Sequence, residues 1–289
     1  MSDHGAAVAR KVESLRTTDL RALEAAVIEK RLRWCDDNIG ALDGASATPR
    51  LGYETLLFRY LRLSEDDVPV VSESDGEITW LSRNACPTLD ACAQLSLATS
   101  SVCRSVYEKP TQALLSFLGP ELRFVRHYTE MRPEHPHCKE TILRLDFGKM
   151  MSVAIAEARE SRATGNKGYG AIVVLGDRVL SAAHDTVATD GDPSLHAEVN
   201  AIRGAAHAVG DANLCGAVLF STCEPCPMCS SLAVWANVTT IVFGASIQQT
   251  AQLGKSRIQV SAAEIVERSP GWTEVIGGVM AEDCLDLYR

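Results

Sequence analysis

Four residues in the second half of the chain have the types and spacing of a metal-assisted acid–base site. His196 and Glu198 are separated by one residue, and Cys226-x-x-Cys229 follows further along. One imidazole nitrogen and two thiolates suit Zn²⁺ and leave the fourth tetrahedral position open for water. Zinc lowers the pKa of such a water from about 15.7 toward about 7. A carboxylate two residues from the histidine can take that proton, so we assign Glu198 as general acid and base rather than ligand.

Both parts of this set are expected at the openings of helices. The Cys226-x-x-Cys229 spacing places both sulfurs on the first turn of a helix, where backbone N–H groups favour thiolate over thiol. Pro225 stands just before that turn, and its fixed φ suits entry to a helix. His196 and Glu198 lie at the start of a helix predicted over residues 195–208.

The surrounding residues predict an α/β domain over 141–289. Gly176-Asp177 is a tight turn between two apolar runs, which indicates an antiparallel hairpin. Helices between the later strands imply parallel crossovers. The result is a three-layer α-β-α arrangement around a mixed five-stranded sheet. Strands are predicted over 170–175, 178–183, 217–221, 239–243 and 272–276, and helices over 141–162, 195–208, 227–236, 262–267 and 281–288.

Residues 1–140 predict a separate, mainly helical α+β domain whose role the sequence does not reveal. Apolar residues at helical spacing indicate a helix over 4–36, broken and capped near Thr18 or Asp19. Asp75-Gly76 between β-branched runs predicts a hairpin over 68–81. Further helices are predicted over 53–63, 87–97, 100–107 and 110–118, a strand over 121–126 and a loop over 40–49.

Composition narrows the class of protein. The chain has 289 residues, 46% of them hydrophobic, and a net charge of −9, which is a poor starting point for binding nucleic acid. No apolar run is long enough to span a membrane, and residues 1–5 do not begin a secretion signal. We therefore expect a cytoplasmic protein whose ten cysteines are thiols or metal ligands.

The first half offers three weaker patterns, each with an ordinary alternative. Four cysteines invite a second metal or iron–sulfur site, but their spacing matches no common motif and buried thiols are ordinary. Residues 91–116 have a helix-turn-helix look, with few basic side chains. A basic cluster could recognise an anion such as a nucleotide phosphate, or be a solvated face, which we favour. The cysteines are Cys86, Cys92, Cys103 and Cys138, and the cluster is Arg123, Arg126, His127, Arg132, His135 and His137.

Residues 142–289, about half the chain, resemble the cytidine deaminase-like superfamily, and in particular its guanine deaminase and tRNA adenosine deaminase branch. The resemblance runs through His196-Ala-Glu-Val-Asn-Ala-Ile-Arg203 and Leu219-Phe-Ser-Thr-Cys-Glu-Pro-Cys-Pro-Met-Cys229. It implies zinc bound by His196, Cys226 and Cys229, a proton shuttle at Glu198, and hydrolytic release of ammonia from an aminated ring. The alternative is a purely structural zinc site with Cys223 as fourth ligand, which leaves Glu198 without a role.

Three residues are candidates for substrate binding. Asp185 stands where the family commonly has an asparagine that hydrogen-bonds the base, so the substrate presents a donor there or Asp185 is protonated; the alternative is a surface turn residue. Tyr169 stands in place of the phenylalanine in the family's Pro-Phe-Gly-Ala. Its side chain either lines the pocket or only packs against its neighbours. Trp235 stacks on the base or packs in the core.

These observations favour a zinc-dependent aminohydrolase acting on a free nucleobase, nucleoside or related small aminated heterocycle, of guanine or cytosine type. Its partners are then the heterocycle and water, in nucleobase metabolism. A homodimer or higher homo-oligomer is expected, because related deaminases are commonly oligomers. The alternatives are a tRNA adenosine deaminase, for which residues 281–289 lack a basic helix, and a non-catalytic binding protein on a deaminase scaffold.

Overall fold

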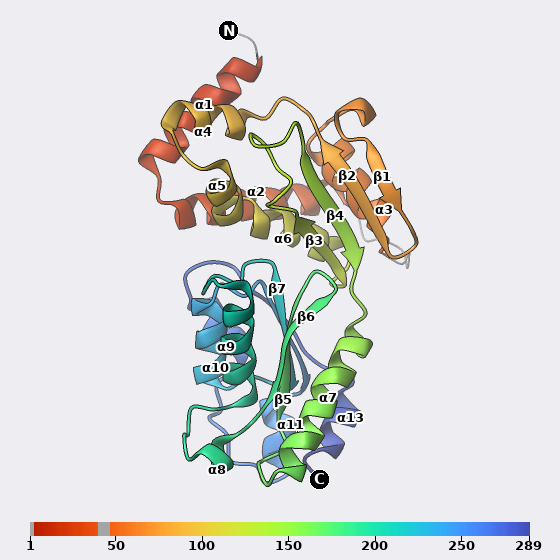
Figure 1. Cartoon of the computed structure of the whole chain (residues 1–289), viewed down its shortest axis with the longest axis vertical. Coiled ribbons are helices and arrows are strands. Elements are labelled where there is room, and N and C mark those ends of the chain that lie inside the picture. The colour runs from red at the N-terminus through yellow and green to blue at the C-terminus, as the bar shows by residue number, and fades with distance from the viewer. Residues whose placement is uncertain (1–2, 40–46) are drawn as a thin grey trace. The chain divides into compact units, whose positions relative to one another are not determined.

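The computed structural model describes residues 3–39 and 47–289 and divides into two compact units, Met1–Leu145 and Asp146–Arg289 (Figure 1). Most of the predicted loop over 40–49 lies outside the described residues. Among the described residues, no helix combines the length and the apolar character needed to cross a membrane.

The first unit combines helices with a four-stranded antiparallel sheet in the order β1-β2-β4-β3. The predicted break in the first helix is present, because the Asp19 carboxylate accepts hydrogen bonds from the backbone N–H groups of Arg21 and Ala22. The elements are α1 (Asp3–Thr17), α2 (Leu20–Asn38), α3 (Pro49–Glu54), the π-helical η1 (Thr55–Tyr60), the 3₁₀ turn η2 (Glu65–Asp67), β1 (Val70–Glu73), β2 (Glu77–Ser82), α4 (Pro87–Leu95), α5 (Thr99–Val106), α6 (Glu108–Leu118), β3 (Leu122–Arg126) and β4 (Cys138–Arg144).

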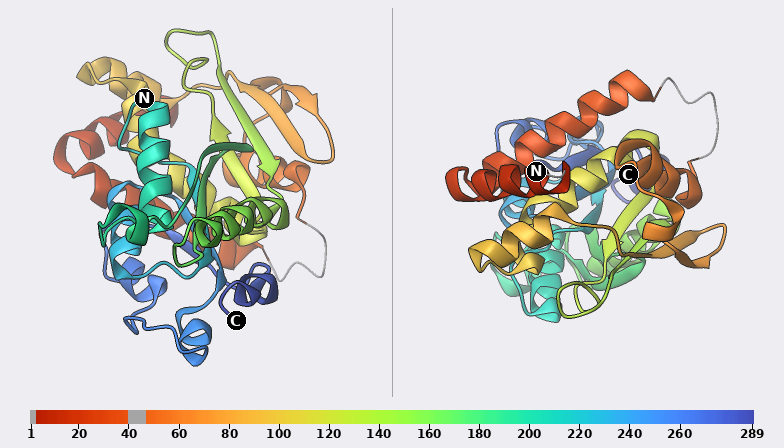
Figure 2. Two further views of the ribbon diagram at one scale, coloured as in Figure 1. Left: turned by 60° about the horizontal axis from the view of Figure 1, so that its bottom comes forward. Right: turned by 90° about the horizontal axis from the view of Figure 1, so that it is seen from above.

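One predicted element of this region is wrong. The long helix expected over 141–162 starts only at Phe147, and its first residues belong to strand β4. Ile142 is fully buried and pairs with Ile78 of β2 and Phe124 of β3, so long-range pairing overrides the local pattern. Figure 2 shows the orange β1–β2 hairpin beside β4 from another direction. Strand β4 therefore crosses the 140/141 position at which the sequence suggests a domain boundary.

The helix-turn-helix interpretation of residues 91–116 is also wrong. In such a module one helix must be free to enter the major groove of DNA. Most of α6 is buried instead, including Gln112, whose amide bonds the backbone at Leu122 and Phe124. Helix α6 is a core element that supports β3.

The second unit is a mixed five-stranded sheet in the order β6-β5-β7-β8-β9. Strand β5 is antiparallel to β6 and β7, whereas β7, β8 and β9 are parallel, as the crossover helices require. The elements are α7 (Phe147–Ala163), β5 (Gly170–Leu175), β6 (Arg178–His184), α8 (Val187–Asp190), α9 (Ala197–Val209), β7 (Ala217–Cys223), α10 (Pro227–Trp235), β8 (Thr240–Ala245), α11 (Ile247–Gln252), α12 (Ala262–Glu267), β9 (Glu274–Ile276) and α13 (Ala281–Asp286).

Helices cover both faces of this sheet, which confirms the predicted three-layer α-β-α class (Figure 1). Ala171 and Val173 of β5 pack into one core with Ala201 of α9. The next side chains along a strand point to the opposite face. There Phe220 of β7 meets Phe147 of α7 edge to face, with the ring centroids 5.4 Å apart. The short helices α8 and α11 are not predicted by the sequence pattern.

Candidate active site

His196, Cys226 and Cys229 form a triangle whose dimensions fit zinc. The His196 Nδ1 atom lies 3.6 Å from the sulfur of Cys226 and 3.5 Å from that of Cys229, and the two sulfurs are 3.6 Å apart. A tetrahedral Zn²⁺ with Zn–S of about 2.3 Å and Zn–N of about 2.0–2.1 Å requires edges of about 3.8 Å between sulfurs and about 3.6 Å between sulfur and nitrogen. The donor set is thus arranged as zinc requires.

The two helices on the same side of the sheet carry these donors. His196 is the N-cap of α9 and Cys226 the N-cap of α10, while Cys229 is fully buried within the first turn of α10. Cys226 therefore lies one residue ahead of the turn on which the sequence predicts it. The hydrogen bond between the Cys226 and Cys229 sulfurs, with His196 beside them, lowers the pKa of Cys226 to about 4. Cys226 is ready to act as a thiolate ligand.

Glu198 lies beside the triangle and is buried. One carboxylate oxygen accepts a hydrogen bond from the Ser221 hydroxyl at 3.2 Å, and the other lies 3.5 Å from the sulfur of Cys229. Burial raises the pKa of the Glu198 carboxyl. This arrangement suits a group that holds a proton next to the metal position and does not bind the metal itself.

A cavity of about 600 Å³ opens onto these groups. It is large enough for a small ligand. Three cations and three carboxyl groups share its wall, a combination that the sequence pattern did not reveal. Besides His196, Glu198 and Cys226, the wall includes Tyr169, Asp185 and Glu224, and the cations are Lys167, Lys255 and Arg257.

Asp185 and Tyr169 both reach the cavity wall. Asp185 is 1% exposed, which excludes a surface turn, and its carboxylate accepts only a long 3.4 Å bond from the Val187 N–H among the described contacts. Tyr169 both lines the cavity and packs, since its ring lies 5.0 Å from that of Tyr288. The Arg257 guanidinium stacks over the Tyr169 ring at 4.6 Å.

Trp235 does not reach this cavity, and its side chain is 72% exposed. It is the last residue of α10, whose buried face is formed by Cys229, Ser230 and Ala233. A residue two positions after Ala233 points away from that face, because successive helical residues are rotated by about 100°. Trp235 therefore neither stacks on a base in this cavity nor packs in the core.

Two residues of the site were not singled out by the sequence. Glu224 is buried, and its two carboxylate oxygens accept from the N–H of Ile247 and the N–H of Ala262, each at 2.9 Å. It thereby joins the openings of α11 and α12. Arg257, between these helices, donates to the Cys223 sulfur at 3.4 Å, and Cys223 is not part of the metal triangle.

The first-half cysteines do not form a comparable donor set. Among the described residues, the zinc triangle is the one group of three His, Cys, Asp or Glu whose ligand atoms all lie within 4.8 Å of one another. Cys86, Cys103 and Cys138 instead line a second cavity, in the first unit.

Comparison with known proteins identifies the second unit. Residues 146–245 match the cytidine and deoxycytidylate deaminase zinc-binding region. The tRNA-specific adenosine deaminase of Bacillus subtilis is 34% identical over 134 residues, which are 46% of this chain and 81% of that enzyme. The chain belongs to this zinc-binding deaminase family, which confirms zinc as the cofactor and a hydrolytic deaminase acting on a C–N bond as the enzyme class.

Other relatives share the same region within different proteins. The guanine deaminase of B. subtilis is 35% identical over 86 residues, which cover 30% of this chain and 55% of that enzyme. The tRNA(Ile)-lysidine synthase of Deinococcus deserti is 34% identical over 141 residues, which cover 48% of this chain but only 25% of that protein. The chain thus spans between a quarter and four fifths of the length of these three relatives.

Proposed function

We propose that the second unit is the catalytic domain of an aminohydrolase that removes an exocyclic amine from a free nucleobase, nucleoside or related small heterocycle, of guanine or cytosine type. The observation that carries this proposal is the open cavity in which Glu198 lies beside the His196, Cys226 and Cys229 triangle. A zinc site that only held the fold would have no use for a buried carboxyl and an adjoining cavity of about 600 Å³.

The proposed chemistry divides between the metal and the protein. Zinc held by His196, Cys226 and Cys229 supplies the Lewis acidity that lowers the pKa of water to about 7. Glu198 takes a proton from the water whose oxygen bonds to the ring carbon. It then returns the proton to the amine, so that the C–N bond breaks and ammonia leaves. The remaining hydroxyl proton moves to the adjacent ring nitrogen, which leaves a carbonyl on the ring. Ser221 holds the carboxylate of Glu198 in place through its hydrogen bond.

The direct test is ammonia release by the zinc-loaded full chain. The substrates are guanine, cytosine, adenine, their nucleosides and 5′-monophosphates, and aminated triazines; the monophosphates are included because three cations line the cavity. Glu198→Gln is expected to lower kcat by about 10²- to 10⁴-fold with zinc content unchanged. Glu267→Gln, an exposed acid on α12, is the control and keeps full activity. Absence of ammonia release from every small substrate, and of adenosine conversion in tRNA, would instead support the non-catalytic binding protein.

A second candidate, deamination of adenosine in tRNA, is favoured by one observation. Of the three relatives described above, the tRNA-specific adenosine deaminase is the one of which this chain covers the largest share, 81%. Against it stands the net charge of −9, since binding an RNA backbone requires a basic surface. Conversion of adenosine to inosine in tRNA, measured beside the small substrates, separates the two: turnover of tRNA alone would replace the small-heterocycle proposal.

A further inference from the structure

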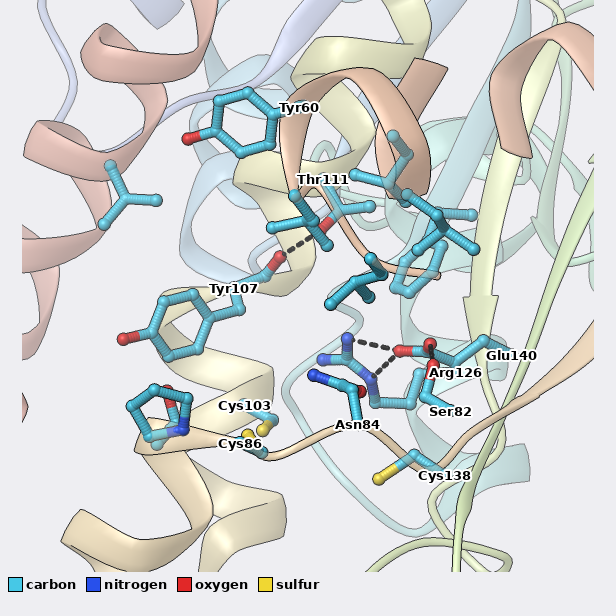
Figure 3. Close-up of a pocket in the computed structure, with 18 of the residues that line it drawn as sticks. Tyr60, Ser82, Asn84, Cys86, Cys103, Tyr107, Thr111, Arg126, Cys138 and Glu140 are labelled. Atoms are coloured by element: carbon cyan, nitrogen blue, oxygen red, sulfur yellow. Dashed lines mark hydrogen bonds and ion pairs between the residues drawn. The ribbon is translucent and has the colours of Figure 1, made fainter. Parts of the chain in front are cut away.

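The first unit contains a second cavity, of about 330 Å³, whose wall is composed entirely of residues between Lys11 and Glu140 (Figure 3). Its volume lies at the lower end of the range for small-molecule sites, about 300–1,000 Å³. Much of the wall is apolar. These side chains include Val27, Leu56, Leu57, Leu63, Phe124 and the ring of Tyr107. A ligand here would have a small apolar body.

Positive charge is concentrated on the same wall. The cations outnumber the carboxylates, because Glu140 is the one acidic residue among the lining residues and Glu108, also buried, interacts with Arg126 from nearby. The Cys103 thiol adds no negative charge near neutral pH, since burial raises its pKa to about 12. The cationic residues of the wall are Lys11, Lys30, Arg31, Arg126 and Arg132.

Arg126 has bonding capacity that the protein leaves unused. Its Nε and Nη2 atoms both donate to one oxygen of Glu140, at 2.9 and 2.6 Å, as Figure 3 shows. Its Nη1 atom is buried and has no hydrogen-bond partner among the described residues. Buried charged donors are costly unless they are paired, so this nitrogen favours an acceptor that the chain itself does not provide.

Two further arginine side chains also have a buried nitrogen without a hydrogen-bond partner among the described residues. Arg31 is 7% exposed; its Nη1 donates to the Thr111 hydroxyl at 2.7 Å, while its buried Nε has no partner in the described part of the chain. Arg132 donates through Nη1 to the backbone oxygen of Asn84 and likewise leaves a buried Nε unpaired among those residues. The charges of Arg31 and Arg126 repel each other, which lowers the pKa of Arg31 further than burial alone. An anion between them relieves that repulsion.

We propose that this cavity binds a small organic anion, with one carboxylate or phosphate group held by Arg126, Arg31 and Arg132 and an apolar body held by the aliphatic and aromatic wall. Each of these guanidinium groups has one unpaired nitrogen that can donate to an oxyanion, and planar guanidinium groups match carboxylate and phosphate geometry. This site is additional to the proposed deaminase activity and does not depend on it. The basic cluster predicted from the sequence as a solvated face is thus partly an internal lining.

Calorimetric titration of the zinc-loaded full chain tests this proposal with three probes of matched tail: hexanoate, hexyl phosphate and uncharged 1-hexanol. At least one anion is expected to bind at a single site per chain, ten-fold or more tightly than 1-hexanol. The ratio of the two anion affinities identifies the head group. Equal affinity of 1-hexanol and both anions, or binding of none of the three, overturns the proposal.

Variants then locate the anion. Arg126→Gln is expected to weaken anion binding at least ten-fold and to leave 1-hexanol unchanged. Arg126 also pairs with buried Glu140, so Arg132→Gln is the deciding variant if Arg126→Gln does not fold, and a loss of about five-fold or more is expected for it. Arg50→Gln is the control: Arg50 is a partly exposed arginine of the same unit, paired with Glu73 and outside the cavity wall, and its variant is expected to keep wild-type affinity. Unchanged anion affinity in Arg132→Gln and in any folded Arg126→Gln overturns the proposal.

A last pair of variants tests whether the anion binds at the candidate active site instead. Arg257→Gln removes a cation from the candidate active site, and Cys226→Ser removes a zinc donor. Both are expected to retain the wild-type anion affinity. If either variant abolishes anion binding, the anion lies at the candidate active site, and the proposal is overturned whatever the outcome of the ammonia assay.

Discussion

Glu198 and Asp185 are two buried carboxyls on one cavity, and their partners suit different tasks. Glu198 is held by the Ser221 hydroxyl and lies beside a zinc donor, as a proton carrier must. Asp185 has one long contact with the Val187 N–H among the described hydrogen bonds of its carboxylate. An acceptor so weakly engaged in the protein is free to receive a hydrogen bond from the substrate.

Asp185→Asn is therefore expected to change which substrate is preferred. An ionised carboxylate only accepts hydrogen bonds, whereas an amide also donates. The ratio of kcat/KM between two substrates that differ in donor and acceptor at the contacted position should shift by about ten-fold or more. The measurement is ammonia release over the substrate panel. Asp190→Asn is the control, since Asp190 is exposed on α8. An unchanged order of preference in Asp185→Asn would show that this residue does not read the substrate.

The metal donors could be predicted from sequence because their identity depends on short spacings that fix local geometry. His196 and Cys226 are caps of two neighbouring helices, and Cys229 follows within one turn. The cations of the cavity wall could not be found in this way. Lys255 and Arg257 lie in a connection without periodic pattern, so only the fold reveals what they approach. Trp235 was misassigned because helical spacing alone does not specify which face of α10 is buried.

At the scale of elements, Glu224 is the residue that organises the wall of the site. One side chain accepts from the first turns of both α11 and α12, which satisfies two N–H groups that helices leave unpaired at their openings. Because the side chain is buried, water cannot replace it readily.

Glu224→Ala is expected to destabilise the protein by about 2–4 kcal/mol, because two buried donors lose a charged acceptor. Unfolding in urea, followed by circular dichroism, measures the change. Glu267→Ala on α12 is the matched control and should stay within about 0.5 kcal/mol of wild type, as is usual for exposed positions. A cost for Glu224→Ala no larger than that of the control would mean that the two helices are held by other contacts.

Strand β4 was missed by the sequence for a physical reason. Residues 141–143 are apolar or β-branched at positions that also fit the helix that follows, so the same stretch fits both a strand and a helix pattern. Pairing with β2 and β3, from residues far apart in the chain, decides for a strand. In the second unit the strands and long helices alternate at regular spacing, and there the prediction from local pattern and the fold agree.

At the scale of the whole molecule, zinc should stabilise one unit and not the other. All three donors lie within Asp146–Arg289, and the described residues of the first unit contain no comparable group. A metal that binds only the folded state adds about 4 kcal/mol when its concentration is about 1,000 times its dissociation constant. Removal of zinc by a chelator is thus expected to lower the melting temperature of one thermal transition.

Metal analysis and calorimetry check this expectation together. We expect one zinc and no iron per chain. Cys229→Ser should reproduce the effect of the chelator, whereas Cys215→Ser, in the same unit but outside the triangle, should bind zinc as wild type does. A second metal per chain that survives Cys229→Ser would point to the cysteines of the first unit.

The contacts of Glu224 also bear on how this protein can be altered. Because the carboxylate fixes Ile247 and Ala262, the intervening connection leaves and re-enters the fold at two anchored points. That connection carries Lys255 and Arg257, but none of the zinc donors. Doubling the length of a flexible loop costs only about 0.6 kcal/mol in closure entropy. We therefore expect that the length of this segment can be varied at modest cost, which would alter one part of the cavity wall while the metal centre is kept.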